Sequence, residues 1–89
     1  MSSVEIYSKP GCVWCIRAKN LLTMKKIPYK EFTVGVNATK DQIQTRVAAL
    51  GESAVVQTLP QIFYTDKTGK VTYIGGFTEL NARQSILGT

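Results

Sequence analysis

The stretch "SKPGCVWCIRAK" (residues 8–19) carries both cysteines of the chain, Cys12 and Cys15, where a predicted strand gives way to a predicted helix. The Pro-Gly pair just before Cys12 turns the chain between these two elements. Two thiols at this spacing serve disulfide exchange, supply half of a metal site, or form a structural disulfide. The remainder of the sequence has to decide among these three uses.

Length and composition argue against a structural disulfide. The 89 residues predict a single domain, residues 1–89, with one modest core. The start "MSSVEIYSKP" lacks the apolar run of a signal peptide, and no stretch approaches the roughly 18 apolar residues of a membrane-spanning helix. We therefore expect a cytoplasmic protein without membrane contact, in a compartment that keeps thiols reduced. A bridge between Cys12 and Cys15 would also close too short a loop to restrict the unfolded chain much.

The sequence contains no histidine, which excludes Ser-His-Asp and Cys-His catalysis together with mixed Cys/His zinc sites. A closed structural zinc site needs about four ligands, and this chain offers two cysteines. A metal site therefore requires ligands from another molecule or subunit. Disulfide exchange becomes the favoured use of the pair.

The net charge of +5 does not indicate a nucleic-acid-binding protein. The Lys and Arg residues are scattered along the chain, without an arginine-rich run or alternating basic and aromatic residues. We interpret the charge as solvated surface that attracts anionic ligands and acidic partner proteins.

Hydrophobic periodicity predicts an α/β domain of seven elements in the order β-α-β-α-β-β-α. We expect strands at 3–8, 29–34, 61–65 and 70–74, and helices at 13–26, 37–51 and 78–87. The first strand, helix and strand should cross over right-handed and form a parallel pair, and the hairpin adds two antiparallel strands. Helices then cover both faces of the sheet. Cys12 follows the carboxyl end of the first strand, where ligands gather in such sheets.

The surroundings of Cys12 favour its thiolate form. Free N–H groups and the partial positive charge of the helix start stabilise an anion, and the ammonium group of Lys9 is nearby in sequence. Cys15 lies one turn into the helix, where it should stay protonated. We expect Cys12 to attack a disulfide and form a mixed disulfide, which Cys15 then resolves.

Three separated motifs resemble the glutaredoxins, most closely the small dithiol members of bacteria and phages: "VEIYSKPGCVWC" followed by "RAK", "TLPQIF", and "IGGFTEL". The resemblance runs nearly end to end. It implies the thioredoxin fold, with sheet order 4-3-1-2, in a monomer. It also implies glutathione-dependent reduction of protein disulfides and glutathione mixed disulfides, with ribonucleotide reductase as a partner of some members. The W-C-G-P-C motif of thioredoxins is absent, which favours glutathione as the reductant.

The resemblance assigns roles to the residues around the cysteines. Cys12 would be the nucleophile and Cys15 the resolving thiol. Lys9 would contact the glycine carboxylate of glutathione. Trp14 stands where the family usually has Tyr, beside the tripeptide, although an exposed Trp14 could instead help to dock partner proteins.

The second motif would supply the backbone contact to glutathione. Thr58, Leu59 and Pro60 match the family's Thr-Val-Pro, whose proline is cis. The resemblance implies that the N–H and C=O groups of Leu59 bind the cysteinyl part of glutathione as an added strand. Gly75 and Gly76 would let that backbone approach closely.

The third motif would hold the γ-glutamyl end of glutathione. The N–H groups of Phe77 and Thr78 would bind its carboxylate, and Glu79 or the Thr78 hydroxyl would bind its α-ammonium. A further contact is expected from the second helix, at one of three residues that the sequence does not distinguish: Gln42, Gln44 or Arg46.

The active-site sequence departs from the family's commonest one, because C-V-W-C replaces C-P-Y-C. Val13 restores a backbone N–H at the helix start, which we expect to stabilise the Cys12 thiolate further. Some glutaredoxins without that proline hold a [2Fe–2S] cluster between two subunits, ligated by the nucleophilic cysteine and bound glutathione. A cluster-binding dimer that uses Cys12 is therefore the alternative function.

Overall fold

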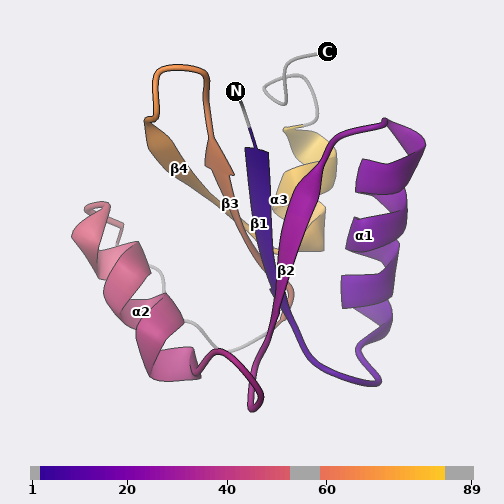
Figure 1. Ribbon diagram of the computed structural model, residues 1–89, viewed down its shortest axis with the longest axis horizontal. Helices are drawn as coiled ribbons and strands as arrows, with labels where there is room; N and C mark the ends of the chain where they lie inside the picture. The colour runs from indigo at the N-terminus through magenta and orange to yellow at the C-terminus, as the bar shows by residue number, and fades with distance from the viewer. Residues whose placement is uncertain (1–2, 53–58, 84–89) are drawn as a thin grey trace.

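The computed structural model describes residues 3–52 and 59–83, which form one four-stranded sheet flanked by three helices (Figure 1). The elements follow the predicted order. The strands are β1 (Ser3–Ser8), β2 (Tyr29–Thr33), β3 (Gln61–Thr65) and β4 (Val71–Gly75), and the helices are α1 (Val13–Met24), α2 (Lys40–Ala49) and α3 (Phe77–Ala82). No helix in these described residues has the length and hydropathy needed to cross a membrane.

The strands lie in the order β2-β1-β3-β4, which confirms the predicted order 4-3-1-2. β1 pairs in parallel with β2 and antiparallel with β3, and β3 pairs antiparallel with β4. Helices α1 and α3 cover one face of the sheet, and α2 covers the other (Figure 1). This is the predicted α/β arrangement of the thioredoxin fold, and it places the loop after β1 beside the start of α1.

The predicted helix bounds differ from the observed ones at their ends. α1 stops at Met24, two residues earlier than predicted, because the chain leaves the helical region at Lys26, whose φ is +58°. α2 begins at Lys40, since Thr39 caps it by accepting a 3.2 Å hydrogen bond from the Gln42 N–H. α3 begins at Phe77, one residue earlier than predicted, and it ends at Ala82 with Arg83 as its C-cap, whereas the prediction ran to residue 87; residues 84–87 lie outside the described residues.

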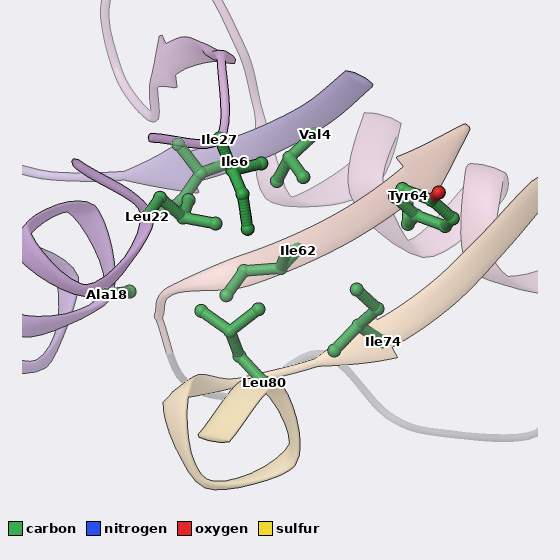
Figure 2. Packing of buried hydrophobic residues seen from close by; sticks show 9 residues of the cluster. All are labelled: Val4, Ile6, Ala18, Leu22, Ile27, Ile62, Tyr64, Ile74 and Leu80. Atoms are coloured by element: carbon green, nitrogen blue, oxygen red, sulfur yellow. The ribbon is translucent and has the colours of Figure 1, made fainter. Parts of the chain in front are cut away.

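One hydrophobic core lies between the sheet and the two helices α1 and α3 (Figure 2). The alternation of β1 points Val4 and Ile6 into this core, and β3 contributes Ile62 in the same way. The buried members are Val4, Ile6, Ala18, Leu22, Ile27, Ile62, Tyr64, Ile74 and Leu80. Because α1 packs along this face, its N-terminal end is held at the carboxyl end of β1.

A second core lies under α2 on the opposite face, and it is closed by an arginine. Its buried members are Tyr7, Ala38, Ile43, Val47 and Phe63. Arg46 donates a 3.0 Å hydrogen bond to the Tyr7 hydroxyl and forms a 2.5 Å ion pair with Glu5, and its guanidinium group lies 4.4 Å from the centre of the Phe63 ring. These contacts fasten α2 to the two central strands.

A small polar cluster ties the end of β1 to α1 and β2. Ser8, the buried last residue of β1, donates a 2.5 Å hydrogen bond to Glu31, and Lys19 forms a 2.9 Å ion pair with the same carboxylate oxygen. The bonds from Lys19 and Ser8 lower the pKa of Glu31 below its ordinary value of 4.5. The cluster fixes the point from which the loop to Cys12 departs.

Glu31 should make the free energy of unfolding depend on pH in the acidic range. Because its folded pKa is depressed, its contribution is present above about pH 4.5 and is lost as the pH falls through the lower folded pKa. We expect Glu31→Gln to be less stable than the wild type near neutral pH, and the difference to shrink as the pH falls below about 4.5. Urea unfolding across this range tests the prediction, and a difference between the two proteins that does not change with pH would contradict it.

The turn from β4 into α3 requires glycine at residue 75. Gly75 has φ of +113°, a conformation that side chains disfavour, and a Cβ built there would lie 2.8 Å from the Glu79 carboxylate and 3.1 Å from its Cγ. Gly69 in the β3–β4 turn has φ of +90°, but a Cβ there would meet nothing within 4 Å. A substitution at Gly69 therefore introduces backbone strain alone, whereas one at Gly75 adds steric crowding.

Replacing Gly75 with alanine should lower the free energy of unfolding more than replacing Gly69 does. We expect Gly69→Ala to lower the free energy of unfolding by about 1 kcal/mol, from backbone strain alone. Gly75→Ala should lower it by at least about 1 kcal/mol more, because the new methyl group displaces the Glu79 side chain. Chemical denaturation of both variants measures the difference, and equal losses would show that the close contact with Glu79 has no energetic weight.

Candidate functional site

The two cysteines are joined in a disulfide at the start of α1, with their Cα atoms 5.2 Å apart. Cys12 is the N-cap residue of the helix, and Cys15 lies in its first turn. The Cys15 side chain is 1% exposed, whereas that of Cys12 is 9% exposed. The structure thus represents the oxidised form of the pair, and the outer sulfur belongs to Cys12.

The Cys12 sulfur occupies the position of a helix-capping acceptor. The Cys15 N–H lies 3.1 Å from it and donates to it, while the Cys12 N–H donates to the Lys9 carbonyl at 3.3 Å. In this disulfide form the donor to the sulfur is the N–H of Cys15, the third helical residue, as is usual for an N-cap side chain. The expected effect of the Val13 N–H on the Cys12 thiolate stays a prediction.

A segment distant in sequence closes the other side of the Cys12 sulfur. The carbonyl oxygen of Leu59 lies 3.6 Å from that sulfur, across 47 positions of the chain. The Leu59–Pro60 peptide bond is cis, as predicted, and Pro60 is buried at the start of β3. The predicted contact at Thr58 lies outside the described residues.

A cavity of about 320 Å³ opens beside this carbonyl. It is bounded by the start of α1, the cis-proline turn and the start of α3. Its lining residues are Trp14, Leu59, Pro60, Gly76, Phe77, Thr78 and Glu79, all of which the sequence had indicated as ligand-binding. Two other predicted residues do not line it: Lys9 is exposed in the loop before Cys12, and Gly75 lies at the end of β4.

The wall of the cavity near Cys12 is aromatic. The Trp14 ring lies 5.6 Å from the Phe77 ring, so the two side chains connect α1 to α3. On the same indole, the guanidinium group of Arg17 lies 4.9 Å from the ring centre. Sequence reasoning alone places Arg17 among the scattered charges; the signal for this contact is its i, i+3 spacing from Trp14 in a helix.

At the far end of the cavity, the start of α3 presents backbone N–H groups. Glu79 already accepts a 2.8 Å hydrogen bond from the Gly76 N–H through one carboxylate oxygen. The N–H groups of Phe77 and Thr78 belong to the first turn, where helical N–H groups have no partner within the helix. A Cβ at Gly76 would lie 3.4 Å from the Pro60 carbonyl, an ordinary contact distance, so the approach of these two segments does not itself require glycine.

None of the three candidates in α2 lines this cavity, and two of them hold the fold together. The Gln42 side chain accepts a 2.9 Å hydrogen bond from the Thr39 N–H, which completes the helix cap. Arg46 is engaged with Glu5 and Tyr7. Gln42, Gln44 and Arg46 are all absent from the described lining of the cavity.

The donor groups of the site point to sulfur chemistry. Within residues 3–52 and 59–83, no grouping of three or more His, Cys, Asp or Glu side chains is arranged to hold a metal ion. The site instead combines a dithiol at a helix start, an aromatic wall and backbone donors and acceptors. These features suit the binding of a small peptide-like anion next to a reactive sulfur.

Comparison with known proteins agrees with this reading of the site. The family model described as Glutaredoxin matches residues 4–68. Glutaredoxin 3 of Escherichia coli K12 is 35% identical over 82 residues, covering 92% of this chain and 86% of the relative. A glutaredoxin of Haemophilus influenzae is 35% identical over 85 residues, covering 89% of this chain and 86% of its own length.

A solved structure supports the same assignment. Glutaredoxin 1 from Francisella tularensis, determined in complex with cacodylate, is 31% identical and superposes with a TM-score of 0.75 over 100% of both chains. The family match, the relatives and the dithiol at the start of α1 lead to one conclusion. This chain belongs to the glutaredoxin family and has the thioredoxin-fold architecture and redox-active Cys-x-x-Cys of a thiol–disulfide oxidoreductase.

Proposed function

We propose that this protein is a glutathione-dependent oxidoreductase that reduces protein disulfides and glutathione mixed disulfides. The observation that carries the proposal is the cavity whose lining includes Leu59, the residue whose carbonyl lies 3.6 Å from the Cys12 sulfur. A tripeptide thiol held there would bring its own sulfur near Cys12. The volume of about 320 Å³ suits a tripeptide that stays partly exposed to solvent.

The chemistry of the cavity matches that of glutathione at the γ-glutamyl end. This end carries a carboxylate and an ammonium group on one carbon. The N–H groups of Phe77 and Thr78 would bind the carboxylate at the start of α3. The second carboxylate oxygen of Glu79, or the Thr78 hydroxyl, would bind the ammonium.

The middle and the glycine end of glutathione would be held by different groups. The backbone N–H and C=O of Leu59 would pair with the cysteinyl residue, as in the addition of a short strand. The indole of Trp14 would cover one side of the tripeptide. Lys9 is exposed in the loop before Cys12, where its ammonium group would attract the glycine carboxylate.

The reaction balances as a two-electron reduction. The Cys12 thiolate attacks one sulfur of the substrate disulfide, the substrate S–S bond breaks, and the released thiolate takes up a proton. Cys15 then attacks the Cys12 sulfur, which frees the second substrate thiol and leaves the Cys12–Cys15 disulfide. Two glutathione molecules reduce that disulfide in turn, and they leave joined as oxidised glutathione.

The burial of the two sulfurs supports this division of roles. Cys12 is the more exposed of the two, and its sulfur accepts from the Cys15 N–H, an arrangement that stabilises negative charge on Cys12. Cys15 is 1% exposed, so an external disulfide reaches Cys12 first. Ribonucleotide reductase as a substrate, the cytoplasmic location and the monomeric state stay predictions from the sequence.

The alternative of a [2Fe–2S] dimer depends on groups that one chain does not supply. The described residues of a single chain bring together two thiols and no third ligand. A cluster bound through Cys12 would therefore need glutathione and a second subunit. The geometry of the cavity favours the oxidoreductase as the function of the single chain.

Substitution of each cysteine should separate the two roles. We expect Cys12→Ser to abolish glutathione-dependent reduction of every disulfide substrate, because the attacking sulfur is lost. Cys15→Ser should retain reduction of glutathione mixed disulfides, which needs Cys12 alone, and lose most reduction of protein disulfides. A coupled assay with glutathione and glutathione reductase measures both activities. Equal losses in the two variants would refute the assigned roles.

The source of electrons and the glycine-end contact can be tested together. With a glutathionylated peptide as substrate, we expect turnover with glutathione and little with thioredoxin reductase. Lys9→Gln should raise KM for this substrate about two- to fivefold, as expected for one exposed charge contact, and leave kcat nearly unchanged. Lys67→Gln in the β3–β4 turn is the matched control. Faster turnover with thioredoxin reductase would overturn the glutathione dependence.

A further inference from the structure

Apolar side chains are unusually exposed around the redox disulfide. Val13 is 58% exposed, Trp14 53% and Ile16 50%, and all three lie in the first turn of α1. We call these three residues the collar. They flank Cys12 and Cys15 in sequence, and leaving such side chains in water has a free-energy cost that a binding role would offset.

The collar extends beyond the proposed glutathione site. Trp14 lines the cavity, whereas Val13 and Ile16 are not among its lining residues. Glutathione in the cavity would therefore leave Val13 and Ile16 exposed. These two side chains remain available to a larger substrate that reaches Cys12 from outside the cavity.

The chain around the collar is basic. Residues 8–19 contain no Asp or Glu, and they carry Lys9, Arg17 and Lys19. Lys19 is neutralised by its ion pair with Glu31. Arg17 holds its guanidinium group 4.9 Å from the centre of the Trp14 ring, directly beside the collar. The first turn of α1 contains no acidic residue to offset the positive end of the helix.

We propose that the collar docks an extended segment of an oxidised substrate protein that has an apolar residue next to its reactive cysteine and acidic residues nearby. This inference rests on the proposed function, because it names the class of protein disulfide that the site prefers. The apolar residue packs on Val13 and Ile16, and the acidic residues face Arg17 and Lys9. A second copy of this chain fits poorly, since its corresponding face carries the same positive charge.

A single-turnover reaction without glutathione tests this docking. The Cys15→Ser variant is mixed with a peptide whose cysteine is joined to thionitrobenzoate. Cys12 attacks the peptide sulfur, the mixed disulfide of Cys12 with the peptide forms, and thionitrobenzoate leaves as a coloured thiolate. Three substrates are compared: a peptide with Leu beside Cys and flanking Asp residues, the same peptide with Lys in place of Asp, and free cysteine joined to thionitrobenzoate.

We expect the acidic peptide to react faster than the basic one, with a preference that shrinks as salt is added. Ile16→Ser, made in the Cys15→Ser background, should slow the acidic peptide about fivefold, as expected for loss of one half-buried apolar contact. The same change should leave the rate with free cysteine–thionitrobenzoate unchanged. The matched control is Met24→Ser, a side chain of the same helix that is 79% exposed but lies at the far end.

Each outcome separates the docking inference from the proposed chemistry. If the acidic and basic peptides react equally fast, or if Ile16→Ser and Met24→Ser have equal effects, the collar is not a docking surface. If Ile16→Ser slows all three substrates alike, the side chain supports the fold of the site and the docking inference fails. If Cys12 reacts with every substrate no faster than an ordinary cysteine, the proposed thiol chemistry itself is wrong.

Discussion

The Cys12 sulfur caps the N-terminus of α1, where the Cys15 N–H donates to it at 3.1 Å, and the rest of the site is built around this contact. The contact makes the attacking atom part of the helix end, so its position is as well defined as that of the helix. It also supplies positive charge from the backbone in a protein that has no histidine. Backbone donors of this kind favour a thiolate over a thiol, and they act on Cys12 only while α1 keeps its position.

Two cores and one polar cluster keep α1 in that place. The core shared by α1, α3 and the sheet holds the axis of the helix, and the contacts of Ser8 and Lys19 with Glu31 hold the strand end from which the active-site loop departs. The core under α2 includes partly buried Leu59 against its edge. The backbone that faces Cys12 is thus supported from the opposite side of the sheet. The fold brings a helix from one face and a turn from the other to the same sulfur.

The side chains of the first turn of α1 face two different regions. Trp14 faces the cavity at the start of α3, where the proposed glutathione would lie, and Val13 and Ile16 remain exposed beside it. Arg17 on the indole adds positive charge between these two regions. A helix makes this division possible, because consecutive side chains leave its axis about 100° apart. Small and large disulfide substrates can then share one reactive sulfur through different neighbouring contacts.

The sequence determined the order of the elements through local periodicity and turn residues, and its resemblance to the glutaredoxins supplied the sheet order 4-3-1-2 and the described residues that line the cavity. It did not determine which N–H reaches the Cys12 sulfur in the disulfide form, where the capping geometry selects Cys15. It also did not show that Arg17 stacks on Trp14, or that Arg46 is engaged with Glu5 and Tyr7. Only the tertiary structure decided these, since each depends on the direction in which a side chain or N–H leaves its element and on partners that are distant in sequence or one helical turn away.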